Sequence, residues 1–403
     1  MKTSSLQFKK AIKSNVRELD VRFIFYNEDR KYVIRGKDIQ SYKYNSLCEE
    51  ELGGIEKKII TLVLMKNAIT RLMDKSTRLY KETWVKFNGV WYSDVQEELI
   101  VTSKNVDEAK NIIRIEAVDK LTIIREQPMP SIPQYKNINL RSYLSLVLSK
   151  LSTSYSISHD ISNPMLKLAF AKSNNIHETL LEMAIAAQGI INSDLTVKRF
   201  AKSTIVDRLD YESGLLEYAI KDDDLDLYKD VVISLFSPTS RVFKSLGSLI
   251  TTIPPAAKEY KIGNIEFDNL YIPQLIKLDH EISIDDYTIS SSGCTLTITN
   301  KQNSLIDLHT EFFGLDVNVL KNTPDSKDNK TKFINNIYIQ SPTSYDSRIY
   351  KSKRVTIKYI GNTLYEIGDT IRLDGKYDVL LTGLDLNYDG SLRGTIKGVI
   401  IDG

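Results

Sequence analysis

About fifty residues at the end of the chain alternate hydrophobic and polar positions with a period of two, which predicts β-strands. Val355, Ile357 and Tyr359 point the same way in the first of these runs. Two Asp-Gly pairs, Asp374-Gly375 and Asp389-Gly390, separate the runs. Such a pair suits the two positive-φ positions of a type I′ hairpin turn. The pattern therefore predicts a meander of three strands.

The last of these strands contains glycine on its hydrophobic face. Gly394 and Gly398 have the same parity as Leu392, Ile396 and Ile400. Glycine inside a strand marks a bulge, a sharp bend or the close approach of another backbone, as happens at barrel corners. We therefore expect a small closed or nearly closed β-barrel at the C-terminal end.

The first 130 residues show the same alternation. Val21, Phe23 and Phe25 alternate with polar or less buried positions, and Ile59 to Met65 continues the pattern. Asn88-Gly89 lies between two hydrophobic runs and predicts a further hairpin. We predict an N-terminal β-barrel domain over residues 1–130.

The hydrophobic period changes after a proline-rich stretch that contains Pro128, Pro130 and Pro133, which cannot continue a helix or a sheet ladder. Hydrophobic residues then recur at helical spacing over 140–151 and again over 180–188. These segments predict an α+β middle domain over 131–250, followed by a β-rich region over 251–403 that ends in the C-terminal barrel. The expected fold class is α+β, mainly β, with two small β-barrel domains flanking the middle domain.

Composition and charge limit the possible functions. The 403 residues are 42% hydrophobic and 26% charged, which is typical of a soluble globular protein with several domains. The N-terminal segment is too polar for a secretory signal, and no apolar run approaches the roughly 20 residues that span a bilayer. Lys and Arg together number 54 against 52 Asp and Glu, so the net charge of +2 gives no global field that would attract nucleic acid. We expect no membrane insertion and no sequence-specific nucleic-acid binding.

Motifs for catalysis are missing from the sequence. No nucleotide-binding glycine loop or nucleophile elbow occurs, and the histidines do not have metal-ligand spacing. These are His159, His177, His280 and His309. Two acidic clusters occur, and we interpret both as solvated rather than catalytic. These are Asp222, Asp223, Asp224 and Asp226, and the pair Glu97 and Glu98. We therefore predict no catalytic, cofactor-binding or metal-ligating residues, no cofactor and no enzyme activity.

Four segments in order resemble the baseplate hub, or tail-tip hub, proteins of tailed bacteriophages, including the N-terminal hub part of tail-associated proteins. Asp38 to Asn67 is similar to an early strand followed by a glycine and an alternating strand. Glu97 to Leu121 is similar to the paired strands of the hub. Asn175 to Phe200 resembles the helix and strand of the middle domain, and Tyr359 to Gly398 resembles the closing barrel.

The resemblance implies a structural protein of the virion tail, made in the host bacterial cytoplasm. Three subunits with two barrels each would form a homotrimeric ring that joins a hexameric tail tube to a three-fold tip and lets DNA pass. The implied partners are the tail tube or distal tail protein, the tip or spike protein, and the tape measure protein. The chain stops directly after the barrel, so wall-degrading activity would need a separate subunit.

Two alternatives stay open. The first is a hexameric distal tail or carbohydrate-binding receptor protein, which exposed Tyr and Trp clusters with nearby carboxylates would favour. The second is a cell-wall hydrolase that uses one of the acidic clusters, for which Asp222, Asp223, Asp224 and Asp226 are the residues to test.

Overall fold

The structure is a computed structural model of the chain. It describes residues 5–14, 17–48, 53–94, 96–127, 129–130, 132, 135–169, 171, 175–200, 204–221, 230–238, 244–256, 260–266, 271–278, 283–289, 293–321, 331–340 and 348–402. These residues are mainly β-strands with few helices, as the sequence predicts. None of the described helices is long and apolar enough to cross a membrane.

The chain divides into two units, and each is described by itself. Unit 1 combines Met1–Ile123, Gln188–Leu227 and Ser347–Gly403, and unit 2 combines Ile124–Ala187 and Tyr228–Asp346. The boundaries expected from the sequence, 1–130, 131–250 and 251–403, stay a prediction.

The described part of unit 1 contains short helices and two groups of strands. Helix α1 (Leu6–Ile12) precedes the first strand. The N-terminal strands are β1 (Leu19–Asn27), β2 (Arg30–Arg35), β3 (Ile39–Cys48), β4 (Gly54–Met65), β5 (Arg78–Phe87), β6 (Val90–Ser93), β7 (Glu97–Asp107) and β8 (Ile112–Val118). The later strands are β12 (Gly189–Ile191), β13 (Thr196–Arg199), β14 (Ile205–Leu209), β15 (Leu215–Lys221), β24 (Arg354–Ile360), β25 (Thr370–Leu373), β26 (Tyr377–Tyr388) and β27 (Leu392–Asp402). Helix α2 (Lys120–Ile124) lies where unit 1 meets unit 2 in the sequence.

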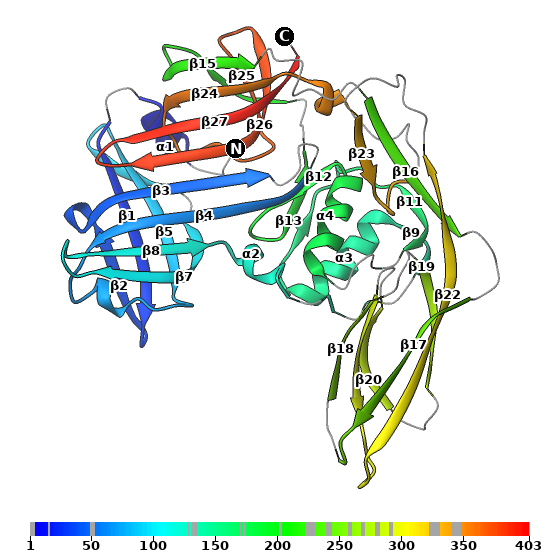
Figure 1. Cartoon of the computed structure of the whole chain (residues 1–403). Helices are drawn as coiled ribbons and strands as arrows, with labels where there is room; N and C mark the ends of the chain where they lie inside the picture. The colour runs from blue at the N-terminus through cyan, green and yellow to red at the C-terminus, as the bar shows by residue number, and fades with distance from the viewer. Residues whose placement is uncertain are drawn as a thin grey trace. The chain divides into compact units, whose positions relative to one another are not determined.

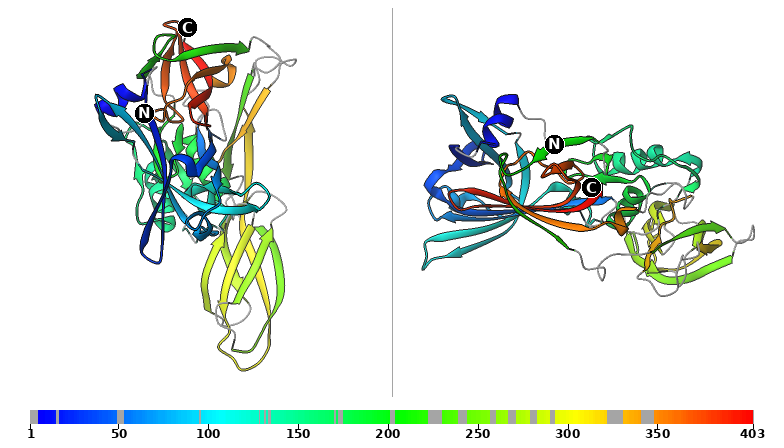
Figure 2. Two further views of the ribbon diagram at one scale, coloured as in Figure 1. Left: turned by 90° about the vertical axis from the view of Figure 1, so that its left-hand side faces the viewer. Right: turned by 90° about the horizontal axis from the view of Figure 1, so that it is seen from above.

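One continuous series of strand pairings runs through unit 1. The N-terminal strands pair in the order β2, β1, β5, β7, β8, β4 and β3. Strand β3 then pairs with β26, from Tyr42 opposite Tyr388 to Leu47 opposite Gly383. The series continues through β27 and β24 to β15. The first and last segments of the chain therefore share one antiparallel ladder (Figures 1 and 2).

The predicted closed barrels are not found among the described pairings. Each strand has two edges, and β3 uses one for β4 and the other for β26, so neither edge can pair with β2 to close the N-terminal sheet. Strand β26 pairs with β25 near its start and with β3 near its end, and its register shifts between Leu381 and Gly383. This irregularity lets one strand leave the second sheet and extend the first.

The hairpin turns follow the sequence prediction, with one difference. Asp374 has φ 49° and Gly375 has φ 68°, so both central residues of the turn between β25 and β26 are left-handed, as a type I′ turn requires. In the turn between β26 and β27 only Gly390 is left-handed, at φ 101°, while Asp389 is not. The second hairpin is confirmed, but its type I′ turn was a wrong prediction.

The glycines of β27 allow close packing. The expected approach of another backbone occurs at Gly398, where a Cβ atom would lie 2.8 Å from the carbonyl oxygen of Leu380, while at Gly394 the neighbour is a side chain. A Cβ atom at Gly394 would lie 2.2 Å from the ring of Tyr359, and one at Gly398 would lie 2.4 Å from the side chain of Val379. Gly394 pairs directly with Tyr359 across the β24–β27 ladder. Tyr359 is 1% exposed, so its ring cannot move aside into solvent. Only glycine fits at position 394 without displacing the core.

Unit 2 holds the two longer helices, α3 (Leu140–Leu151) and α4 (Ile176–Ala186), which contact each other. Asn139 caps α3 by accepting from the Ser142 amide, and Asn175 caps α4 by accepting from the His177 amide. The strands of unit 2 are β9 (Tyr135–Asn139), β10 (Ser156–Ile157), β11 (Met165–Ala169), β16 (Asp230–Pro238), β17 (Lys244–Ile253), β18 (Tyr260–Glu266), β19 (Tyr271–Leu278), β20 (Ser283–Ile289), β21 (Gly293–Thr299), β22 (Ile306–Lys321) and β23 (Thr331–Asn335).

The close approach at Gly394 gives a test of the packing. We expect Gly394→Ala to lower the free energy of unfolding by roughly 1–3 kcal/mol, because the added methyl overpacks against Tyr359. Urea denaturation measures this change. Lys397→Ala is the matched control, since Lys397 is exposed on the same strand, and it should change stability by less than about 0.5 kcal/mol. Equal effects of the two substitutions would contradict the packing argument.

Candidate assembly surface

Both tryptophans of the chain lie on the outer face of the β5–β6 hairpin. Trp84 pairs with Ser93 across this hairpin, and Trp91 pairs with Lys86. Because side chains alternate along a strand, Trp84 and Lys86 share a face, while Val85 between them is fully buried in the core. Trp91 is 38% exposed. This side of the antiparallel sheet therefore presents large aromatic rings to the surroundings.

Tyrosines and cations extend this surface over β1 and β5. Tyr26, which is 53% exposed, meets Tyr80 edge to face with ring centres 6.1 Å apart. The guanidinium of Arg22 lies 4.2 Å from the ring centre of Trp84. Trp, Tyr and Arg are the residue types enriched at the energetic centres of protein interfaces. We call these five residues, Arg22, Tyr26, Tyr80, Trp84 and Trp91, the aromatic face.

Strand β2 adds positive charge beside the aromatic face. Arg30, Lys31 and Arg35 are all exposed, and we call them the basic strip. Lys31 pairs with Tyr26 and Arg35 pairs with Arg22, so these two cations point to the same side as the aromatic face. Within the described contacts, no acidic side chain neutralises the basic strip. Carboxylates lie on this side as well, since Asp20 accepts from Arg22 at 2.7 Å, Glu82 accepts from the Trp84 indole at 2.9 Å, and Glu98 pairs with Tyr80 across the strands. The combined surface therefore has aromatic rings at its centre and charges of both signs around them.

The inner side of the same sheet carries a buried network of charges. The carboxylate of Glu97 lies 3.1 Å from the ammonium of Lys58 and 3.5 Å from that of Lys81. Lys58 also lies 3.5 Å from Glu56. The side chains of all four residues are at most 10% exposed. Two cations and two anions balance each other, which removes the large cost of burying a net charge.

Neutral groups complete this network. The hydroxyl of Tyr44 donates to Glu97 at 2.9 Å, and the hydroxyl of Ser46 donates to Glu56 at 2.7 Å. Lys58 donates to Ser193, which follows β12 in the chain, at 3.1 Å. Burial disfavours the charge of Lys58, but the neighbouring carboxylates of Glu56 and Glu97 outweigh burial and hold the Lys58 pKa well above its usual value. The network thus links β3, β4, β5, β7 and the chain segment after β12.

The sequence prediction for the acidic pair was half right. Glu97 and Glu98 do point to opposite faces of β7, since Glu98 is 40% exposed beside Arg78 while Glu97 is buried. The interpretation of Glu97 as solvated was wrong. Glu56 and Lys58 fall on the same face of β4 as the buried residues Ile60 and Leu62. This alternation was the sequence feature from which inward-pointing charges could have been predicted.

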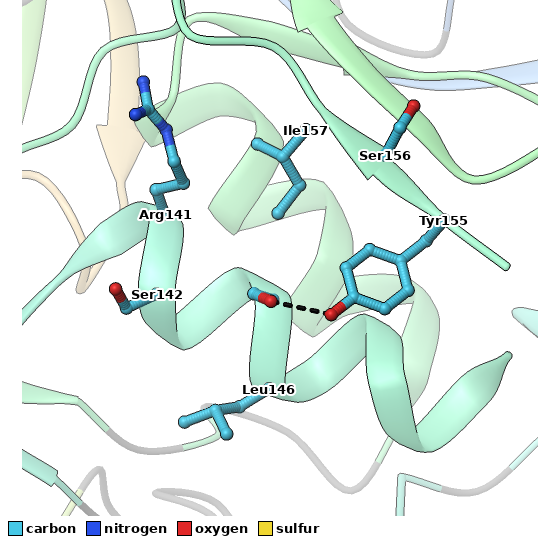
Figure 3. Close-up of a pocket in the computed structure, with 7 residues that line it drawn as sticks. Arg141, Ser142, Leu146, Tyr155, Ser156 and Ile157 are labelled. Carbon is cyan, nitrogen blue, oxygen red and sulfur yellow. Dashed lines mark hydrogen bonds between the residues drawn. The ribbon is translucent and has the colours of Figure 1, made fainter. Parts of the chain in front are cut away.

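An open hollow of about 620 Å³ lies beside α3 in unit 2 (Figure 3). Its described lining is Arg141, Ser142, Ser145, Leu146, Tyr155, Ser156 and Ile157. The hydroxyls of Ser145 and Tyr155 are 2.8 Å apart, and Arg141 donates to the carbonyl oxygen of His159 at 2.6 Å. None of these described lining residues carries a carboxylate.

The three histidines within the described residues belong to different parts of the fold. His177 is in the first turn of α4, His159 follows β10, and His309 pairs with Ile250 in the β17–β22 ladder. His280 and the cluster Asp222, Asp223, Asp224 and Asp226 lie outside the described residues. Across the described ranges, no group of three or more His, Cys, Asp or Glu side chains is arranged to hold a metal. The expectation of no catalytic or ligand-binding residue stays a prediction.

Solved phage tail proteins share the fold of this chain. The 43 kDa tail protein of prophage MuSo2 from Shewanella oneidensis matches with a TM-score of 0.50 and 10% identity, over 94% of this chain and 98% of that one. The tail protein from Neisseria meningitidis MC58 matches with a TM-score of 0.50 and 10% identity, over 94% of this chain and 96% of that one. No family model and no curated protein matches the sequence. The predicted resemblance to phage tail hub proteins is confirmed at the level of the fold.

The buried network generates a stability prediction. Glu97→Gln removes the shared partner of Lys58 and Lys81, and we expect it to lower the free energy of unfolding by about 3–5 kcal/mol, because an uncompensated charge stays buried. Glu98→Gln on the same strand is the matched control and should cost about 0–1 kcal/mol. Denaturant titration compares the two. Equal small effects would show that the network contributes little.

Buried tyrosines generate a pH prediction. Burial raises the pKa of Tyr42, Tyr44, Tyr359 and Tyr365 above the usual value of 10.0. Each of these groups stays protonated in the folded state while it ionises in the unfolded chain above pH 10. Their contribution to the free energy of unfolding is complete below pH 10. It is lost as pH rises further, at about 1.4 kcal/mol per pH unit for each tyrosine. Stability should therefore fall between pH 10 and 11, as measured by denaturant titration.

Arg17 opposes this trend. Burial lowers the pKa of Arg17 to about 10, so the contribution of this one group to the stability of the fold increases as pH rises above that value.

Tyr42→Phe tests the tyrosine contribution by itself, because no hydrogen-bond partner of the Tyr42 hydroxyl is described. We expect Tyr42→Phe to reduce the alkaline loss by the share of one tyrosine. Tyr211→Phe, at a residue that is 59% exposed, should leave the loss unchanged.

Proposed function

We propose that this protein is a non-enzymatic structural hub of a phage tail, which forms a homotrimeric ring at the baseplate or tail tip. The observation that carries the proposal is the fold that it shares with two phage tail proteins along almost the whole chain. The ring joins a hexameric tail tube or distal tail protein to a three-fold tip or spike protein.

The architecture of unit 1 supports this role. The β3–β26 ladder joins an N-terminal and a C-terminal sheet within each subunit. Three subunits with two joined sheets each would offer six docking positions from a three-fold object, which is the arrangement needed to meet a hexameric tube. The tape measure protein and the passing DNA would occupy the centre of such a ring.

The alternative of a carbohydrate-binding receptor protein has one observation in its favour, which is the exposed aromatic face. The geometry of that face argues against sugar stacking. Arg22 covers the ring of Trp84 at 4.2 Å, and Lys86 lies 6.0 Å from the ring centre of Trp91. A sugar would have to displace these cations to stack on the rings. The cell-wall hydrolase alternative rests on Asp222 to Asp226, which lie outside the described residues.

The oligomeric state tests the proposal. We expect light scattering of the purified protein to give about three times the chain mass of 46.0 kDa. Negative-stain images should show rings with three-fold symmetry. Six copies in a ring would favour the distal tail protein alternative. A monomer at all accessible concentrations, or release of sugar from cell walls by the purified protein, would contradict the proposed hub.

A further inference from the structure

The two sides of helix α3 in unit 2 differ in polarity. The side that packs into the core consists of buried residues, which are Leu140, Tyr143, Leu144, Val147 and Leu148. On the other side, Arg141 lies one helical turn from Ser145, and Ser142 lies one turn from Leu146. These four residues and the segment 155–157 line the hollow of about 620 Å³ (Figure 3). The hollow is therefore built from the solvent-facing side of an amphipathic helix.

Arg141 brings a positive charge to the hollow, and no anion among the described residues pairs with it. Its guanidinium donates to the carbonyl oxygen of His159 at 2.6 Å and lies 3.4 Å from Nδ1 of the same residue. Its Nε–H is buried and has no partner among the described residues. Asp160, next to His159 in the sequence, accepts from the Ser158 hydroxyl instead. Because buried polar groups nearly always have a partner, and because a guanidinium bonds most strongly to an oxyanion, Arg141 favours a negatively charged ligand.

The backbone at the start of α3 is not available to such a ligand. The first three amides of the helix already donate to Pro164, Asn163 and Asn139. An anion in the hollow would therefore be held by the side chain of Arg141. The positive end of the helix dipole adds a smaller attraction of the same sign.

Hydroxyl groups supply the second part of the lining. The hydroxyls of Ser145 and Tyr155 are 2.8 Å apart, and whichever accepts in this bond keeps its own proton to donate to a ligand. The side chain of Ser142 is exposed beside them. Leu146 and Ile157 are half-buried and add apolar contact area. The volume falls within the range of roughly 300–1,000 Å³ that is typical of sites for small ligands.

We propose that this hollow binds an acidic sugar. Its carboxylate or phosphate would pair with the guanidinium of Arg141. Its hydroxyls, which both donate and accept, would bond to Ser145 and Tyr155, and its C–H groups would contact Leu146 and Ile157. A neutral sugar would leave Arg141 without an anion, and a simple anion would leave the hydroxyls and the apolar contacts unused. The inference goes beyond the proposed hub and uses residues of unit 2 alone.

Saturation-transfer difference NMR on the full-length protein measures this binding. The acidic probes are D-glucuronate, which carries a carboxylate, and glucose 6-phosphate, which carries a phosphate. We expect dissociation constants on the order of 1 mM, as is usual for a monosaccharide in an open site. Glucose lacks the charge, and acetate lacks the hydroxyls. Glucose should therefore bind at least about 10-fold more weakly than the acidic sugars, and so should acetate.

Substitutions assign the binding to the hollow. Arg141→Gln should weaken the binding of the acidic sugars by about 10- to 100-fold, because it removes charged hydrogen bonds. Lys150→Gln is the matched control, since it removes the same charge from an exposed position of α3 outside the lining, and it should leave the binding unchanged. Tyr155→Phe removes one hydroxyl and should weaken binding by about 2- to 10-fold. Circular dichroism checks that each variant is folded.

The outcomes separate this inference from the proposed function. Binding of D-glucuronate alone, or of glucose 6-phosphate alone, would support the site and identify the oxyanion that it takes. Equal affinity for glucose would overturn the inference, and so would binding that Arg141→Gln leaves unchanged. An absence of binding at about 20 mM of either acidic sugar, well above the expected dissociation constant, would also overturn it. The proposed hub would stand in each of these cases, because the symmetry of the ring is measured separately.

Discussion

The pairing of β3 with β26 is the contact on which the rest of unit 1 depends. It joins two sheets into one series of hydrogen-bonded strands and uses the edge of β3 that would otherwise close the N-terminal sheet. Side chains reinforce the ladder, because Tyr42 stacks on Tyr388 with ring centres 5.4 Å apart. Arg17 adds a further link by donating to the carbonyl oxygens of Gly361 and Leu392. The two sheets therefore behave as one structural unit.

The local parts of this fold could be predicted from the sequence because local chemistry determines them. Asp374-Gly375 and Asn88-Gly89 form hairpins since their backbones adopt the left-handed conformation at low cost. Gly394 was expected to mark a bulge, a bend or the approach of another backbone, and in the structure the ring of Tyr359 fills the space that its missing side chain leaves. These signals lie within a few residues of the structures they produce.

The β3–β26 pairing could not be predicted in the same way. Asn45 and Asp385, which form a side-chain hydrogen bond across it, are 340 residues apart in the sequence. Alternation shows which face of a strand is buried but not which strand lies beside it. Both sheets were therefore expected to close on themselves. For the same reason the partners of Glu97 could not be predicted, because Lys58 and Lys81 reach it from separate strands.

Part of the aromatic face could also be predicted from the sequence. Trp84 and Lys86 have the outward parity of β5, opposite to the buried Val85. Their neighbours Arg22 and Tyr26 come from β1, so the composition of the surface became visible only with the strand pairing. A surface of this kind is a property of the sheet and not of any one segment.

The order of the segments in unit 1 has a consequence for biosynthesis. Asn45 leaves the ribosome 340 residues before Asp385, yet the two residues lie in one ladder. During synthesis this edge of β3 therefore waits for its partner until the later strand has been made. An unpaired strand edge can pair with another chain, so this interval exposes the growing polypeptide to aggregation.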